Sequence, residues 1–429
     1  MGGDEVKTNR DGAATLVLGM LAHTGRSEAV GELHARPFPL VASPAVIIEL
    51  AFMTGESAEA DRDALAAVSR LGGVAPPQAG ARIHVAPMAG GTLRWESHAE
   101  FSTWRWEGPA SSGRGFTPFS TLSPPPGAVI AGVRVDIANW TRGAQKLVAA
   151  FDQASLCHST VDDGAAAIVT DFRQDSDGLT RILILDKAMS PARLGALSQR
   201  LIEIEVYRTL ALLTLPIARR LSASTGAMEN ELAEITGEMQ KNGRNSAALL
   251  DRLTTLAARL EGETAASLYR FGAARAYHEI VEQRLASIRE EPVSGYGGWW
   301  SFLKRRLNPA MRTCRSVEER QESLSRKLAR TTTLLRSWVE VDLQNQNREL
   351  LASMNKRADL QLRLQQTVEG LSVAAVSYYV VGLIGYAFKG AEKILPVSVA
   401  VATAFSVPLV LAAVWWMVRR IRRHHSEPL

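Results

Sequence analysis

Cysteine is scarce in this chain of 429 residues, which contains only Cys157 and Cys314. The two cysteines lie far apart in the sequence and form no CxxC pair. The sequence therefore supports neither a disulfide framework nor a cysteine-rich zinc site. This cysteine usage is typical of a protein in a reducing compartment.

The short motifs of common enzymes are also missing. The sequence contains no GxSxG and no HExxH, and neither cysteine belongs to a recognisable motif of a catalytic cysteine and its base. The loop "SSGRG", residues 111–115, has neither the lysine nor the following helix of a phosphate-binding loop. We therefore expect no catalytic residue, no enzymatic activity and no cofactor.

A large excess of one charge is absent too. Lysine and arginine number 49 against 44 acidic residues, giving a net charge of +5. Much of this excess lies in the C-terminal "RRIRRHH", which favours a role in membrane orientation over nucleic-acid binding. The N-terminal "MGGDEVKTNRDG" lacks the apolar segment of a signal peptide, so we expect the large N-terminal part to stay in the cytoplasm.

Charged residues disappear almost completely from two stretches near the C-terminus, residues 371–388 and 394–418. As a helix, the first would be about 27 Å long, close to the thickness of a hydrocarbon core. The short "KGAEK" between them predicts a transmembrane hairpin. Trp415 and Trp416 and the four arginines that follow suit a cytoplasmic interface, so both termini should be cytoplasmic. The alternative is two buried helices of a soluble core.

The remaining chain divides by pattern into an α/β or α+β domain (residues 1–189), a helical region (190–309) and a stalk helix (310–370), with a basic tail at 419–429. Within the first domain, we expect a helix over 57–72 with Leu65 and Val68 on its apolar face. Runs of apolar or alternating residues predict strands at 41–53, 92–107, 128–138, 166–172 and 180–187.

Helix signals organise the second and third parts. Ser190 and Pro191 are typical of a helix start, and Pro216 should kink or end that helix. Residues 290–309 contain two prolines and three glycines and predict a turn. The stalk that follows could run for about 78 residues, or about 115 Å. In its polar middle, Asn345 and Gln346 either face solvent or set the register of an oligomer seam.

A long helix leading into a first span, a short loop, a second span and a basic tail resemble the CorA-type magnesium channels. The resemblance covers about the last quarter of the chain and implies a homo-oligomer, a pentamer in that family, with a pore lined by the first span and a possible divalent cation as partner. The stretch "GLIGYA" matches the two glycines of the family's pore motif, but Tyr386 and Ala387 replace its Met and Asn. The pore-lining candidates are Tyr378, Gly382, Gly385 and Tyr386.

A packed, closed bundle of membrane helices is the alternative to a pore. Glycine and serine are common where membrane helices pack closely, and tyrosine is common at membrane interfaces. In addition, Glu392 lies between Lys389 and Lys393, so the outer loop has a net positive charge, which does not favour cation uptake.

The chain as a whole resembles a bacterial family of predicted membrane-bound proteins that is described only as a domain of unknown function. The resemblance rests on "ELHARPFP" at 32–39, on "HAEFST" at 98–103, and on the stretch from Asn347 to Leu383. It covers nearly the full length. It implies the membrane-bound architecture and no activity.

Two weaker sites lie in the N-terminal domain. Arg36 could bind an anion and His34 could transfer protons, although Pro37 and Pro39 explain that stretch as a strand entry. Strict alternation would place Glu96, His98 and Glu100 on one face of a strand, where they could hold a divalent metal. A solvated strand face with ion pairs explains the same pattern.

Together these features predict an α+β membrane protein of the bacterial inner membrane, with CorA-like architecture and the lipid bilayer as a partner. The functional hypothesis is a CorA-like oligomeric ion channel or transporter of unknown selectivity. The alternative is a membrane-anchored oligomeric scaffold or sensor without transport activity. The two differ in whether the first span presents small and polar groups or bulky apolar groups to its neighbours.

Overall fold

A computed structural model describes residues 16–26, 29–30, 38–54, 59–78, 80–111, 115–122, 126–241, 246–390 and 398–424. The chain divides into two compact units. The sheet unit comprises Met1–Gly243 and Asp251–Thr331, and the hairpin unit comprises Arg244–Leu250 and Thr332–Leu429. The sequence-based boundary at residue 189 is therefore not the boundary between these units.

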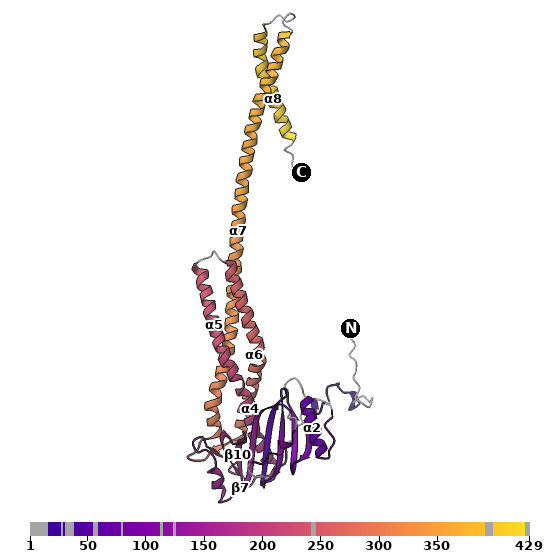
Figure 1. The fold of residues 1–429 in the computed structure, drawn as a ribbon, viewed down its shortest axis with the longest axis vertical. Coiled ribbons are helices and arrows are strands. Elements are labelled where there is room, and N and C mark those ends of the chain that lie inside the picture. The colour runs from indigo at the N-terminus through magenta and orange to yellow at the C-terminus, as the bar shows by residue number, and fades with distance from the viewer. Residues whose placement is uncertain are drawn as a thin grey trace. The chain divides into compact units, whose positions relative to one another are not determined.

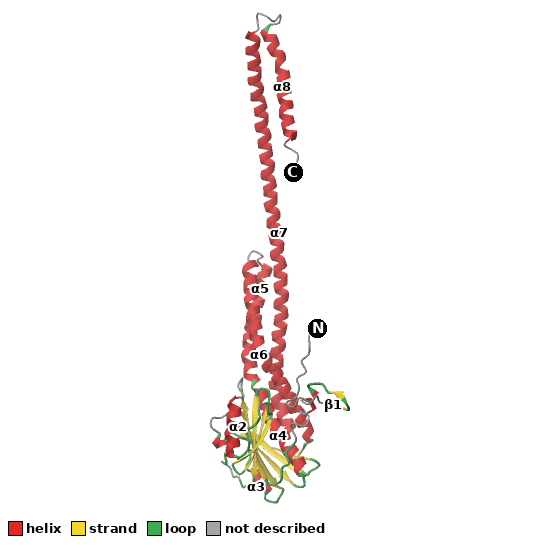
Figure 2. Ribbon diagram, turned by 90° about the vertical axis from the view of Figure 1, so that its right-hand side faces the viewer, coloured by secondary structure: helices red, strands yellow, loops and turns green. Residues whose placement is uncertain are grey.

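The sheet unit is built on a nine-stranded sheet with the order β11-β8-β9-β10-β7-β3-β6-β5-β4 (Figures 1 and 2). A separate two-stranded sheet pairs β1 (Leu16–Val17) with β2 (Met20–Leu21). The strands of the large sheet are β3 (Ala45–Met53), β4 (Ile83–Met88), β5 (Gly91–Ser97), β6 (Phe101–Pro109), β7 (Ala128–Asn139), β8 (Cys157–Val161), β9 (Ala166–Gln174), β10 (Thr180–Asp186) and β11 (Glu291–Pro292).

Strand direction corrects the α/β prediction for this unit. β10 pairs with β7 in parallel, whereas the other named neighbours in the large sheet pair antiparallel. An α/β domain alternates strands with helices that cross over between parallel strands. Here most strands are joined as hairpins, and the long helices follow the sheet in sequence, which is the α+β arrangement.

The described helices are α2 (Glu59–Leu71), the 3-10 turn η1 (Pro118–Thr121), α3 (Ala144–Val148), α4 (Pro191–Leu212), α5 (Thr214–Lys241), α6 (Ser246–Ile288), α7 (Trp299–Gly390) and α8 (Val399–His424). The predicted helix at 57–72 is confirmed as α2, with Leu65 and Val68 buried. Ser190 accepts a hydrogen bond from the backbone N–H of Arg193, which caps α4. Pro216 lies in the first turn of α5, just after α4 ends.

Apolar side chains on both faces of β3 explain why helices cover both sides of the sheet. Ile47 and Ala51 belong to a core cluster that includes α4, whereas Ile48 and Phe52 belong to a cluster that includes α2. Successive side chains of a strand point to opposite faces, so an apolar run without alternation needs cover on both sides. The large sheet therefore lies between α2 and α3 on one face and α4 with parts of α6 and α7 on the other.

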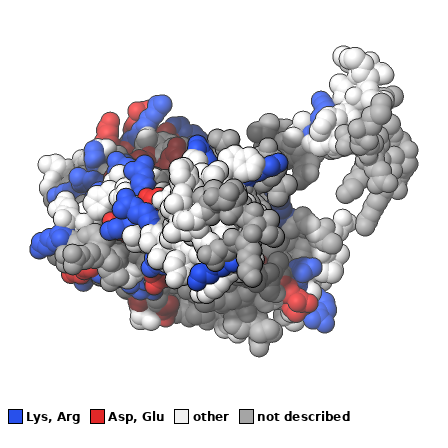
Figure 3. All heavy atoms as spheres, turned by 90° about the horizontal axis from the view of Figure 1, so that it is seen from above, with Lys and Arg blue, Asp and Glu red and all other residues white. Residues whose placement is uncertain are grey.

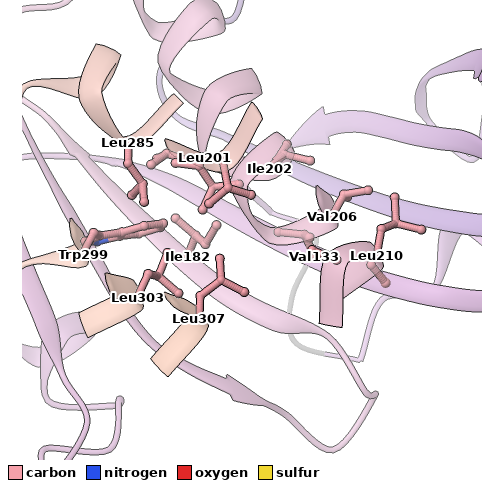
Figure 4. Packing of buried hydrophobic residues seen from close by; sticks show 14 of the residues in the cluster. Val133, Ile182, Leu201, Ile202, Val206, Leu210, Leu285, Trp299, Leu303 and Leu307 are labelled. Atoms are coloured by element: carbon pink, nitrogen blue, oxygen red, sulfur yellow. The ribbon is translucent and has the colours of Figure 1, made fainter. Parts of the chain in front are cut away.

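The α4 side holds the larger core. Val133 and Ile182 from the sheet meet Leu201 from α4 and Leu303 from α7 (Figure 4). Fully burying one leucine contributes about 1.5–3 kcal/mol. This shared cluster joins the predicted helical region 190–309 and the start of α7 to the sheet in one core.

The start of α7 differs from the prediction of a turn over 290–309. The helix begins at Trp299 and continues through Pro309. The Glu290 carboxylate accepts the backbone N–H groups of Trp299 and Trp300 at 2.8 and 2.6 Å, which satisfies donors that a helix start leaves unpaired. Proline inside a helix costs about 3 kcal/mol, and burial of neighbouring Leu307 and Met311 in the core offsets that cost.

Within the hairpin unit, the part of α7 that corresponds to the end of the predicted stalk carries exposed apolar side chains, among them Leu343, Leu350, Leu360 and Leu364. Gln346 donates a hydrogen bond to Asp342 on the same helix at 3.1 Å. Acidic and basic residues are interspersed on the face of the molecule shown in Figure 3. The register role predicted for Asn345 and Gln346 stays a prediction.

Candidate functional site

The first candidate site is the pair of apolar helices in the hairpin unit. The last part of α7 and residues Val399–Arg420 of α8 are long and apolar enough to cross a membrane, with mean hydropathies of 1.7 and 2.0 in their most apolar windows. Only 6% of each window is buried within the chain. These helices therefore differ from the core helices of a soluble protein, which bury their apolar side chains.

Gly385 of α7 lies close to Thr403 of α8. A Cβ atom added at Gly385 would lie 3.5 Å from Cγ2 of Thr403, and Ser377 and Val410 are buried. Small residues let two helix backbones approach closely in a bilayer. Gly385, predicted as a pore-lining residue, therefore lies against α8 of the same chain.

The other three pore candidates lie on a face of α7 that α8 leaves free. The side chains of Tyr378 and Tyr386 are 78% and 75% exposed. A Cβ atom added at Gly382 would have no neighbour within 4 Å among the described residues. Their spacing of four residues places them one turn apart, so Gly382 opens a gap between two aromatic side chains.

Aromatic and basic residues mark the last turns of α8. The guanidinium groups of Arg419 and Arg420 lie 4.9 and 5.2 Å from the ring centres of Trp415 and Trp416. Tryptophan at headgroup level and arginine on the cytoplasmic side are typical of a membrane-water interface. Glu392 and Lys393 of the predicted outer loop lie outside the described residues.

The second candidate site is in the sheet unit, where the predicted strand 92–107 is two strands. β5 ends at Ser97 and β6 begins at Phe101, so His98 and Glu100 lie in the turn between them. Glu96 pairs with Arg94, at 2.7 Å between Oε1 and Nε. No metal-binding group of three His, Cys, Asp or Glu side chains occurs in the described ranges. The prediction that Glu96, His98 and Glu100 share one face of a single strand was wrong, because the turn between β5 and β6 interrupts that strand.

Glu100 connects the β5–β6 turn to α6. Arg270 donates two hydrogen bonds of 2.8 Å to the two carboxylate oxygens, and the hydroxyl of Tyr277 donates a third at 2.5 Å. Burial raises the pKa of the Tyr277 hydroxyl, and its hydrogen bond to Glu100 raises it further. These three contacts use both carboxylate oxygens of Glu100 and hold the β5–β6 turn to α6.

A row of side chains crosses the sheet beside this turn, on the face covered by α4. Glu49 of β3 lies opposite Arg105 of β6, and Arg105 lies opposite Arg94 of β5. Nε of Arg105 donates to Glu49 at 2.6 Å, and both side chains are buried. Burial raises the pKa of Glu49, and the Arg105 guanidinium opposes that shift.

A cavity of about 40 Å³ adjoins the row, lined by Glu49, Glu96, His98, Arg105 and Tyr207 among others. His98 stacks on Phe101 with ring centres 4.2 Å apart. The space suffices for a few water molecules. Arg94 and Arg105 with the carboxylates of Glu49, Glu96 and Glu203 form a compensated, largely buried network. The predicted ion pairs are therefore present, but the strand face that carries them is not solvated.

Sequence reasoning did not find Glu49 or Arg105. One signal was available, because Glu49 is the only charged residue in the apolar run "AVIIELAFM" and Arg105 lies between two tryptophans. A lone charge in a buried strand requires a partner. His34 and Arg36, the other predicted binding pair, lie outside the described residues.

These observations define an α+β protein with an N-terminal sheet domain, one long helix, and a second apolar helix that could cross a membrane with it. The chain belongs to the family described as "Protein of unknown function (DUF3422)", which matches residues 21–425. This confirms the resemblance that covers nearly the full length.

Curated proteins gave no match to the chain. Among solved structures, it is similar to the CorA magnesium transporter from Methanocaldococcus jannaschii, over 68% of this chain and 90% of that one. The sequence identity is 11% and the TM-score is 0.16. A TM-score this low supports no conclusion about fold or function.

Proposed function

We propose that the protein is an integral protein of the bacterial inner membrane, crossed twice by the α7–α8 hairpin, with both termini in the cytoplasm. The support is the low burial of two strongly apolar helices within the chain. The tryptophans and arginines at the end of α8 support the orientation. The bilayer would cover apolar surface that the chain itself leaves exposed.

The function that this geometry supports best is an oligomeric ion channel or transporter. In this arrangement several copies, five in the resemblance noted above, place the free face of α7 around a common axis. The open backbone at Gly382 and the hydroxyls of Tyr378 and Tyr386 would contact the permeant ion. The observation that carries the proposal is that these three residues share a face that α8 does not cover. The permeant species, a divalent cation among the candidates, is left open, and no catalytic residue or cofactor is assigned.

A second function, a membrane-anchored oligomeric scaffold or sensor, is favoured by bulky apolar side chains on the same side of α7. Leu371 and Leu383 are also exposed on α7, beside the tyrosines. Large apolar side chains can fill the axis of a closed bundle. In that arrangement Gly382 would allow close packing between copies without leaving a pathway.

The test is ion flux into proteoliposomes that contain the purified full-length protein, with the Gly382→Leu variant. Because nothing among the described residues lies near an added Cβ at Gly382, the variant should keep its hairpin and fill the free face. Gly370→Leu is the matched control, since Gly370 also has open space at its Cβ but precedes the apolar span. Both monovalent and divalent cations are tested.

A channel predicts flux for the wild type and the control, and at least tenfold less flux for Gly382→Leu at unchanged oligomer size. Equal flux in all three proteins would contradict a pathway along this face. Absence of flux from a folded wild-type oligomer under every gradient would support the scaffold.

A further inference from the structure

One segment of α7 in the hairpin unit has no cover within the chain. Every residue from 341 to 368, which we call the exposed stalk, is exposed. As a helix it is about 42 Å long. Helices in water gain most of their stability from packing an apolar face against other elements. The exposed stalk nevertheless carries large apolar side chains, namely Leu343, Leu350, Leu351, Met354, Leu360, Leu362, Leu364 and Val368.

Most of these side chains follow a seven-residue repeat. The positions of such a repeat are lettered a to g, and a and d face the partner helix of a coiled coil. In the exposed stalk and the first residue of the apolar span, the d positions hold Leu343, Leu350, Arg357, Leu364 and Leu371. The a positions hold Asn347, Met354, Gln361 and Val368. A repeat of this kind keeps one seam of the helix directed toward a neighbouring helix along its whole length.

The same repeat separates charged from uncharged residues. The e and g positions, which flank the seam, hold Gln344, Gln346, Leu351, Ser353, Ala358, Leu360, Gln365 and Thr367, none of them charged. Apart from Arg357, the charged residues from 341 to 371 lie at the outer positions b, c and f; they are Asp342, Arg348, Glu349, Lys356, Asp359, Arg363 and Glu369. One side of the exposed stalk is therefore suited to burial, and the other to water.

The charged side excludes lipid as the cover, because charged residues recur along the whole segment and a bilayer core does not accept them. The cover must therefore be another helix outside the bilayer. A second copy of the chain supplies one of matching length and pattern. If α7 enters the membrane in every copy, all copies cross in the same direction and their exposed stalks begin at the same level. That arrangement aligns identical residues in parallel.

We propose that the exposed stalks of two or more copies form a parallel, in-register coiled coil with its seam at the a and d positions. This inference rests on the proposed membrane crossing, which fixes the common direction of the copies. It adds an assembly interface outside the bilayer, and that interface is independent of whether the hairpin conducts ions.

The polar members of the seam have distinct consequences. Asn347 and Gln361 meet their own counterparts, and polar residues at a positions favour one register at a cost in stability. Asn345 falls on the outer position f, so it does not enter the seam. Arg357 brings like charges together at a d position, which weakens the assembly. Replacing Arg357 by leucine should therefore strengthen it.

Cysteine cross-linking in native membranes tests the seam. The natural cysteines, Cys157 and Cys314, are buried. Cysteine variants are made of the full chain at Gln361 (a), Leu364 (d) and Gln366 (f), and the membranes are oxidised with copper phenanthroline. A disulfide requires Cα atoms within about 7 Å. We expect disulfide-linked dimers for Gln361→Cys and Leu364→Cys, and about tenfold fewer for Gln366→Cys.

Two results would overturn the coiled coil. Absence of dimers at both seam positions would exclude a parallel, in-register pairing, and equal cross-linking at all three positions would show random collision. Carbonate extraction of the same membranes tests the spans separately. Release of a cross-linked protein by carbonate would contradict the membrane proposal alone, whereas retention of a protein without cross-links would contradict the seam alone.

Matched truncations measure how much the seam contributes. Leu364 and Leu362 are 65% and 56% exposed in the single chain and differ in heptad position, d against b. In a detergent dilution series followed by sedimentation, Leu364→Ala should raise the dissociation constant of the oligomer at least about tenfold. Leu362→Ala should change it less than about twofold. Equal effects of the two truncations would contradict the seam.

A substitution that should strengthen the assembly completes the test. Arg357→Leu removes the like charges from a d position, and we expect it to lower the dissociation constant at least about threefold. Arg363→Leu, at the outer position c, is the control and should leave the dissociation constant within about twofold of wild type. Weaker assembly in Arg357→Leu would overturn the assignment of this residue to the seam.

Discussion

Leu201 of the sheet unit is fully buried, whereas Leu350 and Leu364 of the hairpin unit expose 61% and 65% of their surface. Charge shows the reverse distribution. The sheet unit buries Glu49 and Arg105 as a pair, whereas the apolar stretch 371–388 has no charged residue. A soluble core tolerates a charge when its partner is adjacent, but a lipid-facing helix has no such partner. The two units are therefore suited to different surroundings.

The two units also use tryptophan in different ways. In the sheet unit, Trp104 and Trp106 are fully buried, and the indole N–H of Trp106 donates to the carbonyl of Met88 at 2.8 Å. In the hairpin unit, Trp415 and Trp416 are exposed beside arginines. The same side chain fills a core in one unit and suits a membrane interface in the other.

Removing one member of the buried ion pair should have the largest effect. Arg105→Ala leaves Glu49 buried without its partner, and we expect a loss of about 3–5 kcal/mol in the free energy of unfolding. Guanidinium denaturation followed by tryptophan fluorescence measures it. The double variant Glu49→Leu with Arg105→Met should lose clearly less, because no uncompensated charge remains. Equal losses would show that the pair is not coupled.

A pair of leucine truncations compares the units directly. Leu201→Ala should cost about 2–5 kcal/mol, because it leaves a cavity in the core of the sheet unit. Leu362→Ala, in the hairpin unit, should change the free energy of unfolding by less than about 0.5 kcal/mol, since its side chain is exposed. The same denaturation experiment measures both. A large loss for Leu362→Ala would mean that another copy of the chain buries this residue.

The smallest expected effect concerns pH. Asp61 is buried at the start of α2 and accepts from the Ser102 hydroxyl and the Trp104 indole, at 2.9 and 3.1 Å. Burial raises the pKa of Asp61, and the hydrogen bonds oppose that shift. The folded state therefore binds the proton more tightly than the unfolded state, so this contribution is present below the unfolded pKa and is lost as pH rises through the folded pKa.

Asp61→Asn removes the titrating group while its amide oxygen can still accept a hydrogen bond. We expect the variant to lose less stability than the wild type as the pH rises above about 4, the ordinary pKa of an aspartate. Denaturation curves at a series of pH values provide the comparison. Parallel curves for the two proteins would rule out Asp61 as a source of the pH dependence.

Local signals in the sequence predicted several elements well. Ser190, Pro191 and Pro216 marked the ends of helices because capping and the missing proline N–H act within one turn. The predicted start of α7 was wrong because a distant side chain, Glu290, caps the helix at Trp299 and the core supports Pro309. The alternating pattern from Thr92 to Glu107 did not reveal the turn at His98. Polar and apolar residues alternate with the same period in β5 and β6, so the two short strands were predicted as one.

The sequence by itself determined the order of the parts and the two apolar helices, because charge exclusion and helix signals depend on the composition of consecutive residues. Only the tertiary structure decided that Gly385 contacts α8 while Gly382 remains free, since the two glycines differ in what lies beside them in space. The same holds for Arg94 and Arg105. Strand register, which depends on pairing across the sheet, brings them face to face although 11 positions separate them in the sequence (105 − 94).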